Sequence, residues 1–147
     1  MDRGTAVVLT ALAGGLIALQ APINGRLGEA AGSVQAAFAT FVIGGAVLMV
    51  IAALAKGGLG QVAEVRHVSW IYLTGGILGG IYVTTALITV RYLGAGGVTA
   101  ATIAGQLSLS LVVDQLGWLG VERSPITATK LAGVALLTAG VFLIVRD

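Results

Sequence analysis

Residues 33–55 of the chain read SVQAAFATFVIGGAVLMVIAALA, and this stretch decides the fold because it contains no charged side chain. It lies inside a run of 26 uncharged residues between Glu29 and Lys56. A helix rises about 1.5 Å per residue, so roughly 20 apolar residues cross the hydrocarbon core of a bilayer. The stretch therefore predicts a membrane-spanning helix.

The other charges are spaced in the same way and mark the ends of four further apolar windows. The last window reaches the required length if the long side chain of Lys130 carries its ammonium to the interface. The first window is longer than the apolar region of a signal peptide, which has about 7–15 residues. None of the windows shows the alternation of a transmembrane β-strand. We predict an all-α integral membrane protein with a single membrane domain over residues 1–147. Its five transmembrane helices are expected near residues 4–22, 33–55, 69–90, 97–118 and 126–145.

The composition excludes several classes of function. Only 10% of the 147 residues are charged and 57% are hydrophobic, whereas a soluble domain carries about 25% charged residues. There is too little polar material for the surface of a soluble enzyme, and we predict that the protein is not an enzyme. A net charge of +2 without a basic stripe argues against nucleic-acid binding. With no cysteine and one histidine, we expect no metal site and no cofactor.

The positive charges give a weak orientation. Five spans place the two termini on opposite sides of the membrane. The side that carries the N-terminus is expected to hold five bases and the other side three, which places the N-terminus in the cytoplasm. So small a bias also permits insertion in both orientations, or pairing with a related chain of opposite orientation. The five bases are Arg3, Lys56, Arg66, Arg123 and Lys130, and the three are Arg26, Arg91 and Arg146.

Polar residues inside the spans are the candidates for function, because lipid cannot solvate them. Gln106, Ser110 and Asp114 are spaced i, i+4, i+8 and share one helix face. Asp114 is the only acid inside any window. The three side chains are expected to form one wall of a small polar cavity, in which a desolvated acid would suit a proton-coupled carrier. The alternative is that Asp114, about one turn from the interface, simply reaches water.

Two further features carry open alternatives. Gln20 and Asn24 flank Pro22, which frees a backbone carbonyl one turn earlier. This pattern fits the broken helix of a transporter, with both amides as substrate contacts, but it equally fits a helix that ends at Pro22 and Asn24. Tyr82, near the middle of the third window, either lines a pathway or bonds to a neighbouring helix.

Four segments of the chain carry a resemblance to a known family: QAPINGRLG (20–28), AFATFVIG (37–44), GQLSLS (105–110) with Asp114 and Gly117, and GVALLTAG (133–140). In these segments the chain resembles the YdcZ-like family of the drug/metabolite transporter superfamily. The resemblance implies a five-helix protein that pairs in antiparallel orientation into a ten-helix bundle, with itself or with a paralogous chain. It also implies small-molecule transport in the bacterial inner membrane. The first span lacks the glutamate that the small multidrug resistance relatives use for proton coupling, so coupling by an acid would fall to Asp114.

We therefore expect a secondary transporter, acting as an exporter, for a small polar metabolite or drug-like compound. Two antiparallel chains would provide alternating access around a shared pathway. The alternative is a non-transporting membrane scaffold or assembly subunit, which the 23 glycines would support by close helix packing. The residues expected to bind substrate or couple transport are Asp114, Gln106, Ser110, Asn24, Gln20 and Tyr82.

Overall fold

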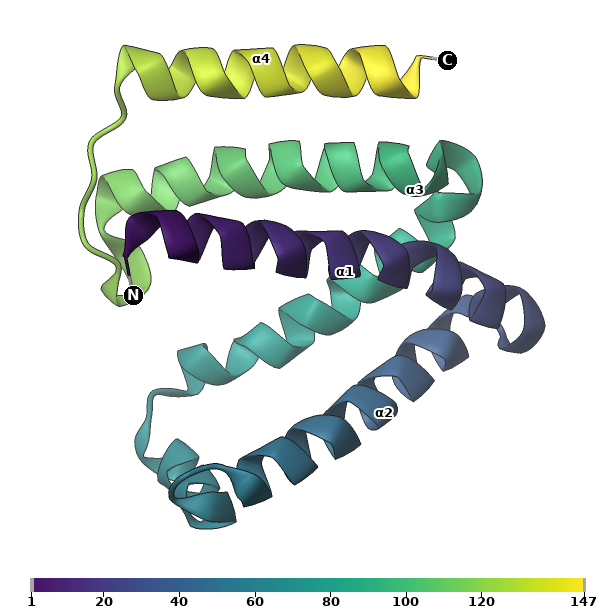
Figure 1. Cartoon of the computed structure of the whole chain (residues 1–147), viewed down its shortest axis with the longest axis vertical. Helices are drawn as coiled ribbons and strands as arrows, with labels where there is room; N and C mark the ends of the chain where they lie inside the picture. Colours follow the sequence, from purple (N-terminus) through teal and green to yellow (C-terminus); the bar gives the residue numbers. More distant parts are fainter. Residues whose placement is uncertain (1, 147) are drawn as a thin grey trace. The chain divides into compact units, whose positions relative to one another are not determined.

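The computed structural model describes residues 2–146, and all of the regular elements in that range are helical (Figure 1). This confirms the all-α class. Four of the helices are long and apolar enough to cross a membrane. The elements in chain order are α1 (Arg3–Ala31), α2 (Ser33–Leu54), the 3₁₀ helices η1 (Gly58–His67) and η2 (Trp70–Thr74), α3 (Gly75–Leu116), the 3₁₀ turn η3 (Trp118–Gly120) and α4 (Ala128–Val145).

Helix α3 provides two of the predicted spans. Together with η2 it forms an apolar helical stretch of 47 residues, about 70 Å of helix and therefore more than two bilayer cores. Gly94 interrupts it with φ 65° and ψ 173°, a conformation that glycine adopts without steric cost. The first half of α3 (75–93) and its second half (95–116) are therefore separate segments, so the four helices provide five segments of spanning length.

The predicted ending or break of the first span near Pro22 is wrong. Helix α1 continues through Pro22 to Ala31, and a single residue, Gly32 with φ 92°, separates it from α2. Pro22 removes only the hydrogen bond to the carbonyl of Ala18. Spanning helices tolerate this loss where neighbouring helices support the segment, and Asn24 on the next turn is buried by such neighbours.

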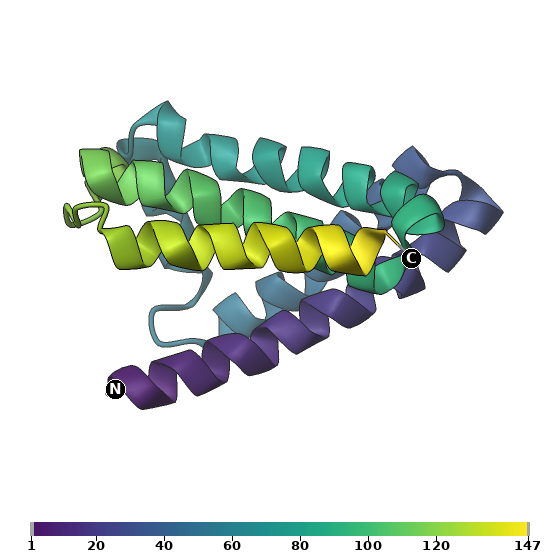
Figure 2. The ribbon, with the colours of Figure 1, turned by 90° about the horizontal axis from the view of Figure 1, so that it is seen from above.

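The contacts divide the chain into two compact units. The α1–α2 unit, residues 19–91, holds the end of α1, all of α2 and the first half of α3. The α3–α4 unit holds α1 up to Ala18 and the chain from Tyr92 onward. Within it, the second half of α3 and α4 run side by side in opposite directions (Figures 1 and 2).

Small residues bring the helices of the α1–α2 unit together. Ala36, Ala37 and Leu87 form its buried centre. A Cβ on Gly25 would lie 2.9 Å from Val90 Cγ1, and one on Gly28 would lie 3.2 Å from Leu87 Cδ2. The end of α1 therefore touches the first half of α3 through glycine, the usual way that spanning helices approach closely.

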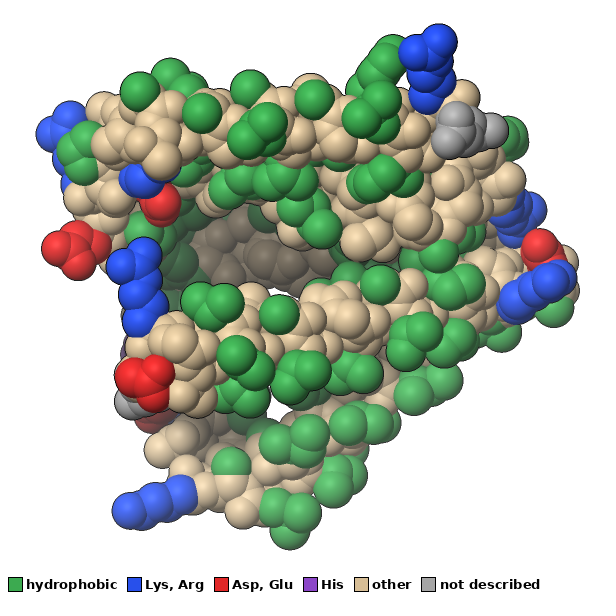
Figure 3. All heavy atoms as spheres, turned by 45° about the horizontal axis from the view of Figure 1, so that its top comes forward, with side chains coloured by type: hydrophobic (Ala, Val, Ile, Leu, Met, Phe, Trp, Pro, Cys, Tyr) green, Lys and Arg blue, Asp and Glu red, His purple; other side chains and the backbone are tan. Residues whose placement is uncertain are grey.

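The helix flanks are mostly apolar and exposed within the chain. Figure 3 shows hydrophobic side chains along the helices, with the charged side chains gathered at the helix ends. Lys130 follows the same rule, because its Nζ turns back to donate to Ser124 Oγ at 2.8 Å and to the Pro125 carbonyl at 3.0 Å.

Candidate functional site: an apolar hollow continued by a polar stripe

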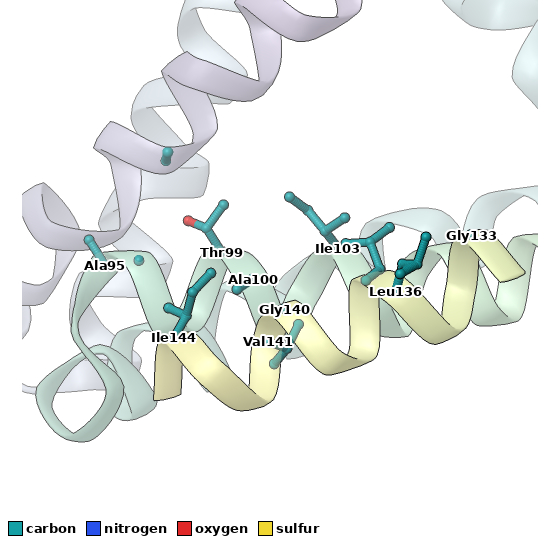
Figure 4. Close-up of a pocket in the computed structure, with 12 residues that line it drawn as sticks. Ala95, Thr99, Ala100, Ile103, Gly133, Leu136, Gly140, Val141 and Ile144 are labelled. Carbon is teal, nitrogen blue, oxygen red and sulfur yellow. The ribbon is translucent and has the colours of Figure 1, made fainter. Parts of the chain in front are cut away.

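The α3–α4 unit contains a hollow of about 700 Å³ between the second half of α3 and α4. Ala18 of α1 completes its lining, and none of the lining side chains is charged. The close-up shows Ile103 and Thr99 projecting from α3 toward this space, opposite Leu136 on α4 (Figure 4). The space-filling view shows the same face of the unit as hollowed (Figure 3).

Glycine creates the space on both walls. Gly96 on α3 and Gly133 and Gly140 on α4 line the hollow. A Cβ at any of the three would meet no atom within 4 Å. These glycines therefore leave volume free, in contrast to Gly25, whose missing side chain allows another helix to approach. Volume left free inside a span is room for a lipid chain, a solute or another helix.

Thr99 supplies the only side-chain oxygen in the lining. The hydroxyls of Thr85, Thr89 and Thr138 each donate to the carbonyl four residues earlier. Among the residues that the structure describes, Thr99 makes no bond of that kind, and Figure 4 shows its oxygen directed away from the α3 ribbon. The hollow therefore offers a single neutral hydrogen-bonding group within an apolar wall.

The predicted polar stripe continues the α3 wall of the hollow. Seven residues are nearly two helical turns, so residues seven apart share a face. Gln106 lies seven residues after Thr99, and Ser110 lies seven after Ile103. Asp114 follows one turn later on the same uninterrupted helical segment. The sequence identified this stripe and missed the hollow, because glycine spacing alone does not distinguish a contact from a space.

The three side chains of the stripe differ in their surroundings. Gln106 and Ser110 are exposed within the chain, and Asp114 is half-buried. The Ser110 hydroxyl donates to the Leu107 carbonyl at 3.0 Å. Among the described residues the Asp114 carboxylate forms no ion pair. Its binding and coupling role stays a prediction.

Gln115, which sequence reasoning did not single out, fixes the end of this segment. Its Oε1 accepts from the Ile126 amide at 2.6 Å, and its carbonyl accepts from Arg123 Nε at 3.0 Å. The carbonyl of Asp114 accepts from the Ser124 amide at 2.9 Å. These bonds join the end of α3 to the loop before α4. The sequence gives no sign of this role of Gln115, because its hydrogen-bond donors lie eight and eleven residues further along the chain.

The other candidate residues belong to the α1–α2 unit. Asn24 is 7% exposed, and its Oδ1 accepts from the Thr40 hydroxyl at 3.0 Å. This bond joins α1 to α2, a common use of polar side chains between spanning helices. Gln20 is exposed on α1, and Tyr82 is half-buried on the first half of α3. Contact of these three residues with a substrate stays a prediction.

A metal centre has no support in the described part of the chain, where no three His, Cys, Asp or Glu side chains lie close enough to share an ion. The site thus consists of an uncharged hollow, one threonine hydroxyl and a stripe of an amide, a hydroxyl and a carboxylate. Such a set can bind an amphipathic solute by apolar contact and a few hydrogen bonds.

Apolar helices of spanning length, charges at their ends and a hollow within a span define the class as a multi-pass membrane protein. The chain belongs to the family described as "Putative inner membrane exporter, YdcZ", whose model matches residues 5–143. It is accordingly a multi-pass protein of the inner membrane. The description of the family is that of an exporter. Neither curated proteins nor solved structures give a match to the chain.

Proposed function

We propose that the protein is a secondary transporter that exports a small metabolite or drug-like compound by alternating access, as an antiparallel dimer. The observation that carries this proposal is the continuity between the apolar hollow and the polar stripe on one face of α3. The family description supports the direction of transport.

The hollow favours an uncharged, amphipathic solute. Its volume of about 700 Å³ lies within the range of about 300–1,000 Å³ that is usual for small-molecule sites. Its lining carries no charge to balance an ion, and an unpaired charge in such a place is costly. The apolar part of the solute would fill the hollow. Its polar part would exchange hydrogen bonds with Thr99, Gln106 and Ser110.

A second chain would supply the other wall of the pathway. None of the most apolar 18 residues in α1 or in α4 is buried within the chain. These flanks are free to pack against another copy, and small residues such as Gly14 and Gly15 have open space in front of them. Inverted repeats around a central site are a recurrent transporter architecture. The weak bias of Lys and Arg supports a chain that inserts in both orientations.

Asp114 would couple transport to protons. It is the only acid between Arg91 and Gly117, and it lies at the end of the stripe that leads from the hollow. Protonation would remove its charge and allow this part of the pathway to close around the solute. Asp114→Asn mimics the protonated acid, so we expect the variant to transport with a flat pH profile. An unchanged pH profile would exclude Asp114 as the coupling acid.

The test of the function is flux in proteoliposomes with N-phenylnaphthylamine, an uncharged amphipathic fluorescent probe. We expect saturable movement that requires the protein and responds to a pH gradient. A panel of uncharged amphipathic compounds that compete with the probe would then rank substrates. If dimers are intact and neither the probe nor the panel moves in a saturable way, the protein is a scaffold or assembly subunit instead.

A further inference from the structure

The segment between α2 and the first half of α3 has an unusual helical form. Helix η1 is a 3₁₀ helix of ten residues, whereas 3₁₀ runs beyond three or four residues are uncommon. It follows directly after the end of α2 (Figure 1). None of its residues is buried. Burial of its side chains against the rest of the chain therefore does not explain this long 3₁₀ helix.

Its apolar residues repeat with the period of its own geometry. Leu59, Val62 and Val65 are spaced by three, and a 3₁₀ helix has three residues per turn, so residues i and i+3 lie one above the other. Their exposed fractions are 48%, 56% and 43%. The three side chains therefore form one straight apolar line, which we call the η1 line. Val68, three residues further on and 49% exposed, continues the spacing.

The other two faces of η1 are polar or small. Residues at the next register, again spaced by three, are Gln61, Glu64 and His67. The third register holds Gly60, Ala63 and Arg66. Helix η1 is thus amphipathic in its own period, and an amphipathic helix with an exposed apolar face is typical of segments that lie in a membrane interface.

The neighbours of η1 place it at the membrane surface. Leu54 ends α2 only four residues before η1, and Trp70 begins η2 three residues after it. Because both flanking elements lead into spans, the segment begins and ends next to the interface between water and lipid. Trp70 and Tyr72 are exposed, as expected of aromatic side chains at that level. Lys56 and Arg66 supply cations for lipid headgroups.

We propose that η1 lies flat in the bilayer interface, with the η1 line inserted among the acyl chains and Lys56 and Arg66 at the headgroup level. The partner is the phospholipid surface itself. The helix anchors the adjoining ends of α2 and α3 at one depth. This inference rests on membrane insertion alone and is independent of what the protein transports.

A cysteine scan tests the proposal directly, because the chain has no cysteine of its own. Single cysteines at positions 59–68 carry a nitroxide label in vesicles of phosphatidylcholine and phosphatidylglycerol at three to one. The collision rates with oxygen, which partitions into lipid, and with a water-soluble nickel chelate give the depth of each label. We expect oxygen maxima at 59, 62, 65 and 68, with nickel maxima at 61, 64 and 67.

Three results would overturn the proposal. Labels that are all accessible to nickel would place the segment in water. A period near 3.6 residues would contradict the 3₁₀ line. Exclusion of both reagents at 59, 62 and 65, with spin–spin broadening that disappears on dilution with unlabelled protein, would show that a second chain covers the line.

A pair of matched variants tests whether the apolar side chains of the η1 line hold the segment in the lipid. With the label at position 65, Val62→Asp is expected to lower the oxygen collision rate several-fold, because a carboxylate draws the line out of the lipid. Gln61→Asp adds the same charge on the neighbouring polar face, and we expect it to leave the rate within experimental error. Equal effects of the two substitutions would contradict the assignment of the apolar face.

Discussion

Glycine serves opposite purposes in the two units of the molecule. In the α1–α2 unit, Gly25 and Gly28 allow α1 to touch the first half of α3, with Val90 within 2.9 Å of the place a Cβ would occupy. In the α3–α4 unit, Gly133 and Gly140 line a hollow of about 700 Å³ and face no atom within 4 Å. At these four positions the first unit uses glycine to bring helices together, and the second unit uses it to leave space. We propose that the close contacts stabilise the first unit and that the hollow of the second binds the solute.

Gly25→Leu is expected to have the largest effect on stability. The new side chain would collide with Val90, and overpacking of this kind costs about 1–3 kcal/mol. We expect a clear loss of folded protein in detergent, measured by thermal unfolding. Gly45→Leu, in the same unit, is the matched control, because a Cβ there meets nothing within 4 Å. If both variants unfold at the same temperature, the close contact of α1 with α3 is not what stabilises the α1–α2 unit.

Asn24→Leu is expected to come next. It removes the bond from the Thr40 hydroxyl, and interhelical hydrogen bonds in membranes are worth about 0.6 kcal/mol on average and up to about 1.7 kcal/mol. Gln20→Leu, on an exposed part of the same helix, serves as control and is expected to change stability by less than about 0.5 kcal/mol. Double-variant analysis with Thr40→Val measures the bond. Additive effects of the two substitutions would show that Asn24 and Thr40 do not interact.

Gln115→Leu is expected to loosen one end of the α3–α4 unit without unfolding it. The substitution removes the acceptor of the Ile126 amide, so hydrogen exchange at that amide should accelerate about tenfold, the equivalent of about 1.4 kcal/mol. Gln106→Leu, nine residues earlier on the same segment, should leave the Ile126 amide unchanged. Equal protection in both variants would mean that the loop is held by Arg123 and Ser124 alone.

The smallest effect is expected at the N-terminus of α1. Asp2 Oδ1 accepts from the Thr5 amide at 2.9 Å and Oδ2 from the Thr5 hydroxyl at 2.6 Å, and these bonds lower the pKa of Asp2 below its usual 3.8. A lowered pKa in the folded state means that the cap stabilises the helix above pH 3.8 and is lost as the pH falls through the lowered value.

Hydrogen exchange at the Thr5 amide measures this cap. We expect its protection to decline below pH 4 in the natural protein, and to be lower and independent of pH in Asp2→Ala. A pH response that survives in Asp2→Ala would assign it to another group.

The sequence predicted the helices well, because a charged side chain is costly in lipid whatever its neighbours along the chain are. Each run of uncharged residues, such as 33–55, identifies a helix without knowledge of its neighbours, and α2 begins and ends within one residue of that run. The length of α1 was not predictable in this way. Its last turns depend on contacts with Thr40 and Val90, which lie far along the chain. A local reading of Pro22 therefore ended the helix too early.

The candidate site was predicted only in part for the same reason. The spacing of Gln106, Ser110 and Asp114 fixed their shared face, because helical periodicity is a property of the segment alone. The hollow arises between two segments, and nothing in the order of residues separates Gly140, which leaves a space, from Gly25, which makes a contact. The 3₁₀ form of η1 likewise became visible only with the backbone in view, although its period of three is present in the sequence.

The most direct test of the central claim is the flux of N-phenylnaphthylamine through Gly140→Leu compared with Gly44→Leu. Both substitutions place a leucine where a Cβ meets nothing within 4 Å, but only Gly140 lines the hollow. Both variants are expected to keep the natural unfolding temperature, because a Cβ at either position meets no atom within 4 Å. If the hollow binds the solute, the two variants differ only in transport. Transport then falls at least tenfold in Gly140→Leu and stays near the natural rate in Gly44→Leu. Equal transport rates in the two variants would contradict the account.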